Sequence, residues 1–479
     1  MRILFVSSEG LPFSKTGGLA DVVEALPKAL IEVGHEVAVV LPRYRGTKSD
    51  KVVAPSLTIP LGSRLRFPRI TDGQELHGVR YFFVDDPSFD REKLYGDASG
   101  DYPDNAERFA LFSKAAIEIA KHVWKPDVMH CHDWQSALVP VMLRTVYGDD
   151  PAVKSIPVVF TVHNMGYHGL YGAEVLSRIG LPAELLHMDA LEFYGRVNYL
   201  KGGLIFSDYI TTVSRKYAQE VQTPEYGHGL EGVVRRRSER MVGILNGVDY
   251  SVWSPEADKF IAARYSMKDL SGKAECKKDL LKEFGLSPDN MGRPLVGIVS
   301  RFADQKGFDL IAQVARDMLK EDLGLVVLGT GDPRYESLFQ QMSKVFPGKV
   351  AARIGFDNTL AHKIEAGSDM FLMPSRYEPC GLNQIYSLRY GTVPIVRATG
   401  GLDDTIQHFD PVASTGTGFK FEQYDGRELL ACVREAVRVF SDREAWRRLM
   451  ANGMAKDFSW TASAAEYSRL YELARKSRA

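Results

Sequence analysis

Two separate series of short apolar segments, each followed by a turn and a helical stretch, constrain the fold of this chain most strongly. In the first half these segments are 2–7, 35–41, 128–130 and 158–162. In the second half they are 295–300, 325–328, 350–354, 370–373 and 393–396. Nearly continuous apolar runs of this length are typical of parallel strands that are buried on both faces of a sheet. The sequence therefore predicts an α/β chain with two doubly wound parallel-sheet domains.

Turn residues indicate where one domain ends and the next begins. The dipeptides Asn246-Gly247 and Ser254-Pro255 lie between the two series and are typical of turns. We place an N-terminal domain at 1–243 and a C-terminal domain at 244–456. From this pattern alone, the last helical segment, after Trp460, could cap either domain.

Composition excludes several classes of protein. The chain has 60 Lys and Arg against 61 Asp and Glu, a formal charge of −1, so a nucleic-acid partner is not expected. Four widely separated cysteines predict neither a disulfide scaffold nor a zinc ribbon. No apolar window approaches the roughly 18 residues that a membrane span requires, and the first residues lack a signal-peptide core. We therefore expect a cytoplasmic protein with no membrane partner.

The loop after the first strand is suited to an anion. Lys15, Gly17 and Gly18 precede a helix predicted at 21–31, which Gly34 ends. Glycine lets the backbone approach a phosphate, the helix N-terminus directs N–H groups at it, and the lysine adds a charge. A tight turn without any ligand fits this loop equally well.

A second glycine pair echoes the first. Gly400 and Gly401 also open a helix, in the other domain. Because ligands of α/β proteins bind beyond the carboxyl ends of the strands, the two glycine loops could face one another across a cleft.

Two loops of the second half place charged groups after strands. Arg301 can hold phosphate oxygens bidentately and Lys306 adds a point charge, although two loop cations are more often only solvated. Glu378 can accept hydrogen bonds from sugar hydroxyls, or it can merely complement the dipole of the helix after Gly381. Cys380 is more typical of a small buried residue than of a nucleophile. The position at strand ends favours a binding site.

Polar side chains also end two strands of the first half. His130, His132 and Asp133 end one strand, and His163-Asn164 ends the next. This cluster could bind a metal or a substrate, but no further ligand recurs at a spacing typical of metal sites. A lone histidine in such a place is more often a satisfied structural group. The recurrence at successive strand ends favours a substrate site.

Taken together, these segments resemble the bacterial glycogen synthase and plant starch synthase family, glycosyltransferase family 5. The shared motifs extend over nearly the whole chain: Lys15-Thr16-Gly17-Gly18-Leu19-Ala20-Asp21-Val22, His132-Asp133-Trp134, His163-Asn164, Leu245-Asn246-Gly247-Val248-Asp249, Ser300-Arg301 with Gln305-Lys306-Gly307, Glu378-Pro379-Cys380-Gly381-Leu382 and Thr399-Gly400-Gly401-Leu402. The first and the sixth of these motifs are specific for the family when they occur together.

The resemblance implies a GT-B fold, in which two Rossmann-like domains surround a deep cleft and a final helix, here 457–479, returns to the N-terminal domain. It implies transfer of glucose from ADP-glucose to the non-reducing 4-hydroxyl of an α-1,4-glucan (glycogen). The reaction it implies retains the anomeric configuration and needs neither a metal nor a cofactor. Because the chain begins at its first strand, the bacterial enzyme fits better than the plant one.

The resemblance also implies roles for single residues. Catalytic roles fall to His163, Glu378, Arg301, Lys306 and Asp133. Substrate contacts fall to Lys15, Gly17, Gly18, Asp21, Tyr95, Asn164, Asn246, Phe356, Cys380, Gly381 and Leu382. Within these sets, Arg301 and Lys306 match a diphosphate clamp, and Phe356 stands where the family often has a tyrosine against the adenine.

Charge explains the mechanism that the resemblance implies. Breaking the sugar–phosphate bond leaves negative charge on the diphosphate, opposed by the clamp, and positive charge on the sugar, for which the resemblance points to the backbone carbonyl of His163. Attack on the same face and a short-lived covalent intermediate both fit the sequence.

Other functions are weighed against this one. A GT-B enzyme with another nucleotide-glucose and a non-catalytic glucan-binding relative are the alternatives. A metal-dependent transferase would want a carboxylate pair, and no Asp-x-Asp occurs in the chain. A glycoside hydrolase needs two carboxylates, and only Glu378 stands in a motif.

Overall fold

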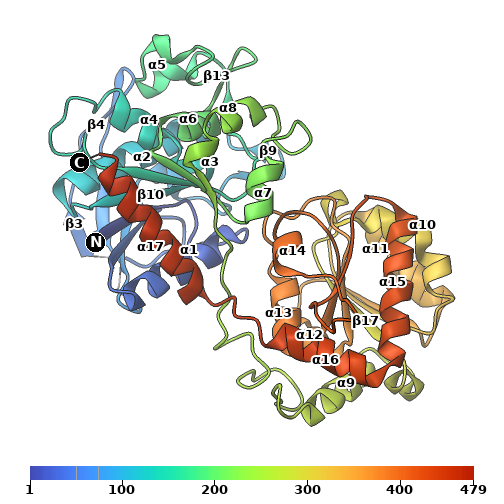
Figure 1. Ribbon diagram of the computed structural model, residues 1–479. Helices are drawn as coiled ribbons and strands as arrows, with labels where there is room; N and C mark the ends of the chain where they lie inside the picture. The colour runs from blue at the N-terminus through green and yellow to red at the C-terminus, as the bar shows by residue number, and fades with distance from the viewer. Residues whose placement is uncertain (50, 74, 479) are drawn as a thin grey trace. The chain divides into compact units, whose positions relative to one another are not determined.

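The computed structural model describes residues 1–49, 51–73 and 75–478. The chain divides into two compact units (Figure 1): unit 1 comprises Met1–Gly247 and Trp460–Ala479, and unit 2 comprises Val248–Ser459. The boundary that we expected at 243/244 lies a few residues before this division. Of the expected final helix, 457–479, Ala479 lies outside the described residues.

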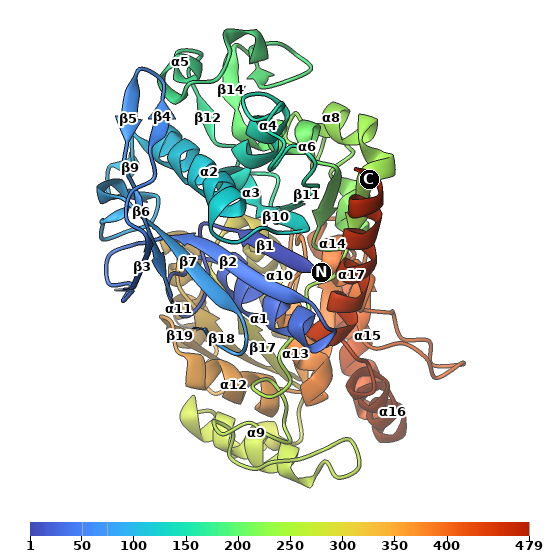
Figure 2. The ribbon, with the colours of Figure 1, turned by 90° about the vertical axis from the view of Figure 1, so that its left-hand side faces the viewer.

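Unit 1 is built on a nine-stranded sheet, which Figure 2 shows along most of its width. Along the sheet its strands are β16 (Met241–Gly243), β15 (Tyr209–Thr212), β11 (Val158–Val162), β10 (Val128–His132), β1 (Arg2–Val6), β2 (Glu36–Pro42), β7 (Arg80–Asp85), β6 (Arg69–Asp72) and β3 (Lys51–Ala54). Neighbours from β16 to β7 pair in parallel, whereas β6 and β3 are antiparallel additions at one edge. The four strands predicted in this half are the central ones.

Short elements complete unit 1. Its small strands are β4 (Ile59–Leu61), β5 (Arg64–Arg66), β8 (Gly96–Asp97), β9 (Gly100–Asp101), β12 (Leu170–Tyr171), β13 (Glu192–Phe193) and β14 (Arg196–Asn198). Its short helices include α5 (Val175–Ile179), α7 (Arg215–Glu220) and α8 (Glu231–Arg236).

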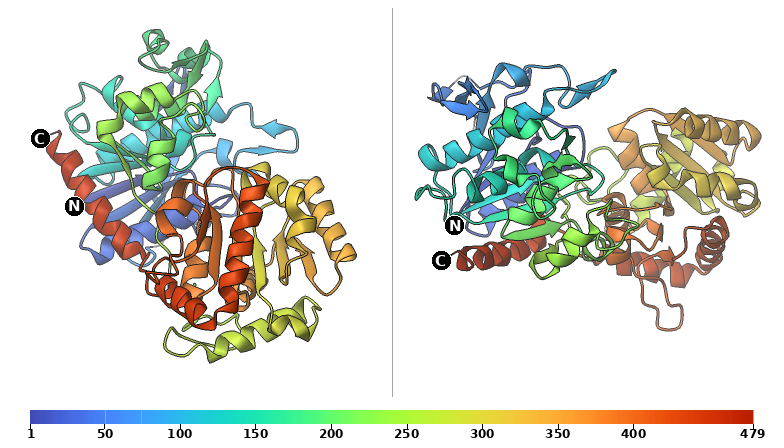
Figure 3. Two further views of the ribbon diagram at one scale, coloured as in Figure 1. Left: turned by 45° about the vertical axis from the view of Figure 1, so that its right-hand side comes forward. Right: turned by 90° about the horizontal axis from the view of Figure 1, so that it is seen from above.

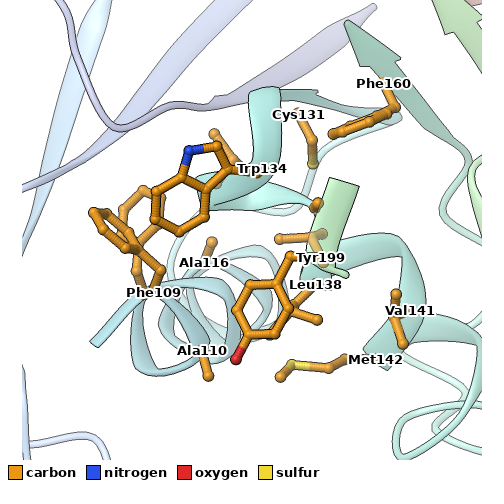
Figure 4. Packing of buried hydrophobic residues seen from close by; sticks show 14 of the residues in the cluster. Phe109, Ala110, Ala116, Cys131, Trp134, Leu138, Val141, Met142, Phe160 and Tyr199 are labelled. Carbon is orange, nitrogen blue, oxygen red and sulfur yellow. The ribbon is translucent and has the colours of Figure 1, made fainter. Parts of the chain in front are cut away.

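Helices cover both faces of the unit 1 sheet, as the continuous burial along its central strands requires. Leu4 and Val6 of β1 pack against one set of helices, while Ile3 and Phe5 pack against the other. The first set is α2 (Asn105–His122), α3 (Asp133–Ser136), α4 (Leu138–Arg144) and α6 (Tyr199–Phe206); the second is α1 (Leu19–Glu32) and α17 (Trp460–Lys476). Figure 4 shows the core on the first face, where Trp134 and Phe109 meet edge to face with ring centroids 5.1 Å apart.

The final helix α17 contacts unit 1 along its length. Near its start the Ser463 hydroxyl donates to the carbonyl of Leu245 at 2.7 Å. Gly247 lies so close to this helix that a Cβ atom there would come within 2.5 Å of the Trp460 backbone. Further along, the Tyr471 hydroxyl lies 2.8 Å from Nδ1 of His130. The helix is therefore part of the unit 1 core.

Unit 2 contains a six-stranded sheet in which all strands are parallel. In order they are β19 (Val350–Ile354), β18 (Gly324–Gly329), β17 (Leu295–Val299), β20 (Met370–Met373), β21 (Val393–Arg397) and β22 (Phe419–Phe421). Five of these strands were predicted. The sixth, β22, is too short to give an apolar run.

Helices also cover both faces of the unit 2 sheet, as the views of Figure 3 show from two further directions. One face carries α10 (Phe308–Met318), α11 (Pro333–Val345), α15 (Gly426–Ser441) and α16 (Arg443–Met454), and the other carries α9 (Ser271–Glu283) and α12 (Asn358–Gly367). Two further helices, α13 (Asn383–Tyr390) and α14 (Gly400–Thr405), pack against β21 through Leu388, Val396 and Leu402. The predicted fold class, α/β with two doubly wound parallel sheets, is confirmed.

None of the helices that the structure describes combines the length and the apolar character needed to cross a bilayer.

Candidate active site

Most of the candidate residues lie at the carboxyl ends of central strands, in one group on each unit. In unit 1 they follow β1, β10 and β11, and in unit 2 they follow β17 and β20. Asn246 and Phe356 follow the edge strands β16 and β19, and Tyr95 directly precedes β8. The carboxyl ends of parallel strands meet at the same edge of a sheet, which is where doubly wound folds bind their ligands. Each group is therefore described on its own sheet.

Glu9, which follows β1, holds the glycine loop of unit 1 in place. Its buried carboxylate accepts hydrogen bonds from the N–H and the hydroxyl of Thr16, both at 2.5 Å, and from the N–H of Gly17 at 3.1 Å. The Tyr95 hydroxyl donates to the same carboxylate at 2.7 Å. Burial raises the pKa of Tyr95 well above its ordinary value, so this hydroxyl stays protonated. Tyr95, predicted as a substrate contact, thus also supports the loop.

No other part of the described chain packs against the loop backbone on the Cβ side of Gly17 and Gly18. A Cβ atom built at either glycine would meet no atom of the described chain within 4 Å. Gly18 has ordinary helical angles, with φ −68° and ψ −15°, and it caps α1. Neither conformation nor packing requires glycine here, which fits a backbone that a ligand approaches. The predicted contacts Lys15 and Asp21 form an exposed ion pair at 2.6 Å.

Replacing Glu9 by alanine is expected to lower kcat/KM about 10- to 100-fold, because the loop loses charge-assisted hydrogen bonds to two N–H groups and two hydroxyls. Steady-state kinetics measures this effect, with circular dichroism to check the fold. Glu32→Ala, an exposed glutamate of the same unit, is the matched control. A folded Glu9 variant with unchanged kcat/KM would show that the loop needs no such support.

Asp133 acts on the backbone at the end of the neighbouring strand. Its carboxylate accepts the N–H of His163 at 2.8 Å. Burial, reinforced by the charge of Glu9, raises the pKa of Asp133 to about 7, and the backbone N–H groups of His163 and Asn164 oppose this rise. Asp133 itself has a positive φ of 56°, a conformation that Asp and Asn tolerate better than most residues. This carboxyl therefore changes its charge near neutral pH.

Three histidines lie together beside this carboxyl. His130 is satisfied on both ring nitrogens, by the Thr161 hydroxyl at 2.6 Å and by Tyr471. His132 Nδ1 lies 3.1 Å from Nε2 of His163. Burial lowers the pKa of all three, that of His163 to about 4. His130 is thus a structural histidine, and none of the three is charged at neutral pH.

Two predicted amide contacts differ in their surroundings. The Asn164 side chain accepts the N–H of Gly166 at 2.9 Å and closes the turn after β11. The buried Oδ1 of Asn246 has no hydrogen-bond partner among the residues that the structure describes. Within the same ranges, no group of three or more His, Cys, Asp and Glu side chains is arranged to hold a metal ion.

The site on unit 2 centres on an ion pair between two predicted residues. Lys306 Nζ donates to Oε2 of Glu378 at 2.6 Å, and the Ser375 hydroxyl donates to the same oxygen at 3.1 Å. The Glu378 side chain is 8% exposed and that of Lys306 is 22% exposed. Arg301 lies exposed after β17, and its guanidinium has no partner within the described chain. The structure therefore brings the two charges of Lys306 and Glu378 together, and it leaves Arg301 unpaired.

The second glycine pair differs from the first in what it meets. A Cβ atom at Gly400 would lie 2.0 Å from the carbonyl oxygen of Glu378, and one at Gly401 would lie 1.9 Å from that of Cys380. The N–H of Gly401 also donates to the Glu378 carbonyl at 3.0 Å. These glycines let α14 approach the backbone of the Glu378 loop. Packing within unit 2 thus accounts for them, unlike the bare pair of unit 1.

The remaining predicted contacts of unit 2 lie around the same loop. Cys380 is buried, Gly381 has a positive φ of 71°, and Leu382 caps α13. Phe356, in the loop between β19 and α12, is 91% exposed and packs against no core. Single exposed apolar side chains are common on protein surfaces, so this exposure leaves the ring accessible without itself indicating a ligand.

Sequence reasoning missed Glu9 and Ser375. Both lie beyond the carboxyl end of a strand whose other loop residues were chosen, and only Ser7 and Ser8 separate Glu9 from β1. A carboxylate placed at that strand end was the available signal. Its four hydrogen bonds could be seen only in the folded chain.

Comparisons with known proteins cover the whole chain. A family model described as the starch synthase catalytic domain matches residues 2–236, and one described as glycosyl transferases group 1 matches residues 282–452. A glycogen synthase of Koribacter versatilis is 59% identical over 100% of this chain and 99% of its own length. One of Anaeromyxobacter dehalogenans is 47% identical over 98% of this chain and 99% of its own length.

Comparison with solved structures also finds a starch synthase. The catalytic domain of starch synthase IV from Arabidopsis thaliana, bound to ADP and acarbose, has a TM-score of 0.88 at 36% identity and covers 99% of both chains. A sucrose-phosphate synthase from Thermosynechococcus elongatus has a TM-score of 0.62 at 19% identity, covering 98% of both, and shares the fold.

Proposed function

This chain belongs to the family of glycogen synthases and starch synthases, and on that premise we propose that it transfers glucose from ADP-glucose to the non-reducing end of an α-1,4-glucan. A glycosyltransferase of this family takes a nucleotide-sugar donor and a glucan acceptor. The ADP in the starch synthase IV structure supports adenine as the donor base.

The observation that carries the proposal is the pairing of Lys306 with Glu378. Arg301, whose guanidinium has no partner among the described residues, lies in the same segment after β17 as Lys306. Two cations are suited to the two negative charges of a diphosphate, and a carboxylate is suited to sugar hydroxyls. Because negative charge on the leaving diphosphate grows towards the transition state, Arg301 and Lys306 stabilise that state more than the bound donor.

The residues of unit 1 are suited to stabilise the positive charge that develops on the glucosyl ring. The N–H of Asn164 and the carbonyl of His163 belong to one peptide group, so a carboxylate acting on that N–H polarises the carbonyl. The carboxylate of Asp133 accepts the N–H of His163 at 2.8 Å, and in our proposal its charge also acts on the N–H of Asn164, which lowers the pKa of Asp133. In our proposal this carbonyl stabilises the positive charge of the glucosyl ring, and the acceptor attacks the face from which the diphosphate leaves. The configuration at the anomeric carbon is then retained.

The test combines purified protein with glycogen and a nucleotide-glucose. We expect ADP release that matches glucan growth, with α-linked product by NMR. Parallel reactions with UDP-glucose distinguish the alternative donor. Glycogen binding without ADP release from any donor would contradict the enzyme and favour a non-catalytic glucan-binding protein.

Activity is expected to survive an excess of EDTA, because Arg301 and Lys306 supply the positive charge that a divalent cation supplies in other transferases. Initial rates with and without the chelator measure this. A large loss that Mg²⁺ or Mn²⁺ restores would contradict the proposed clamp.

Replacing Phe356 by alanine is expected to raise the KM for the donor about tenfold, since a stacked aromatic ring contributes strongly to holding a base. The melting temperature should stay unchanged because the side chain is 91% exposed. Val412→Ala, at a 95% exposed position of the same unit, is the matched control. Equal donor KM values for both variants would remove Phe356 from the nucleotide site.

A further inference from the structure

The hydrogen bond between His132 and His163 has only two possible proton arrangements. Nδ1 of His132 lies 3.1 Å from Nε2 of His163, and the two rings are nearly parallel, at 29°. Burial keeps both imidazoles neutral, since it lowers both pKa values below the ordinary range. A neutral imidazole carries one N–H and one bare nitrogen. Either His132 donates through Nδ1, or His163 donates through Nε2.

The surroundings of His132 decide between the two arrangements. Its Nε2 is buried and has no hydrogen-bond partner among the described residues. The ring packs against Phe5, at a centroid distance of 5.2 Å, and against His130, at 4.2 Å. If His163 donated, His132 would have to carry its proton on this unpartnered Nε2. A buried N–H without an acceptor is rarer in proteins than a buried acceptor without a donor.

We infer that His132 donates through Nδ1 and thereby fixes His163 as the tautomer protonated on Nδ1. His132 is then a positioning residue, since it acts on the active site through His163. The inference rests on the proposed function only for its kinetic consequence, because the proton arrangement itself follows from unit 1 alone.

The fixed tautomer has a consequence for the ligand. His163, a half-buried residue directly after β11, then carries its N–H on Nδ1, and its only other ring nitrogen is occupied by His132. Its side chain is therefore suited to donate to an oxygen of the bound sugar or its phosphate. It is not suited to remove a proton from the acceptor hydroxyl, because it holds no free basic nitrogen.

Two substitutions of His132 distinguish the effect of its N–H donor from the effect of its ring packing. His132→Asn keeps an N–H donor close to the position of Nδ1, whereas His132→Phe keeps a ring and removes the donor. We expect His132→Phe to lower kcat/KM about 5- to 10-fold, the worth of one hydrogen bond, and His132→Asn to restore most of that loss. Melting temperatures of both variants record their effect on packing.

The decisive measurement is ¹⁵N NMR of histidine-labelled protein, with His163 assigned from a His163→Gln variant. The wild type is expected to show Nδ1 of His163 protonated and Nε2 bare, and His132→Phe is expected to release this preference. A wild-type His163 protonated on Nε2, or folded Asn and Phe variants with equal kinetic losses, would overturn the inference. A protein without glucosyl transfer but with the expected NMR signals would contradict the proposed function alone.

Discussion

Replacing Lys306 by alanine is expected to lower kcat about 100- to 1000-fold, the range found when a preorganised donor to a developing negative charge is removed. Lys306 extends from the loop after β17 to Glu378 at 2.6 Å, and it contributes charge rather than core volume. The loss is expected mainly in kcat, because the charge on the leaving diphosphate grows towards the transition state.

The matched control for this substitution is Lys320→Ala. Lys320 also forms a 2.6 Å ion pair, with Asp317, but its side chain is 73% exposed, and it lies between α10 and β18, before the strand rather than after its carboxyl end. It should keep the wild-type kcat. We expect the Lys306 variant to fold, because the Ser375 hydroxyl remains available to donate to Glu378, and circular dichroism checks this. A Lys306 variant with near wild-type turnover would remove this residue from the clamp.

The second large effect concerns pH and Asp133. Because burial raises its pKa to about 7, kcat is expected to fall as the pH is lowered from 8 to 6, when protonation removes the charge that polarises the His163 peptide group. Asp133→Asn should lower kcat about 100-fold at pH 8 and abolish this dependence. Asparagine also tolerates the positive φ at this position. A variant that keeps the wild-type pH profile would contradict the role of Asp133.

Stability gives an independent readout of the same carboxyl. Its folded-state pKa lies above the unfolded value, so the folded state holds the proton more tightly and loses stability as the pH rises from about 4 to about 7. Asp133→Asn should therefore be more stable than the wild type at pH 8, and the difference should shrink towards pH 4. Urea unfolding at the two pH values measures it.

The central strands of both sheets were predictable because burial on both faces demands continuous apolar runs. Strands β15 and β16 were not, since threonine and glycine interrupt their few residues. The antiparallel edge of β6 and β3 was also hidden, because pairing direction is a property of the fold rather than of either segment.

The candidate site shows the same division. The local sequence predicts that Lys306 and Glu378 each follow a strand. Their contact, however, depends on β17 lying next to β20 in the sheet, although β18 and β19 come between them in the sequence. The two glycine pairs look alike as sequence, yet only Gly400 and Gly401 are packed against a backbone. Such differences arise from what the rest of the chain brings near them.

The way unit 2 is inserted into unit 1 sets an order for folding on the ribosome. The two ends of unit 2 meet, since the N–H of Val248 donates to the carbonyl of Phe458 at 2.8 Å. Unit 1, by contrast, buries Trp460, Tyr467 and Tyr471 of α17 in the core that this helix forms with β1 and α1. A growing chain therefore contains every residue of unit 2 before it contains the last layer of unit 1. The domain synthesised first is the one that completes its core last, so its apolar face must stay exposed, or covered by a chaperone, until the final helix emerges.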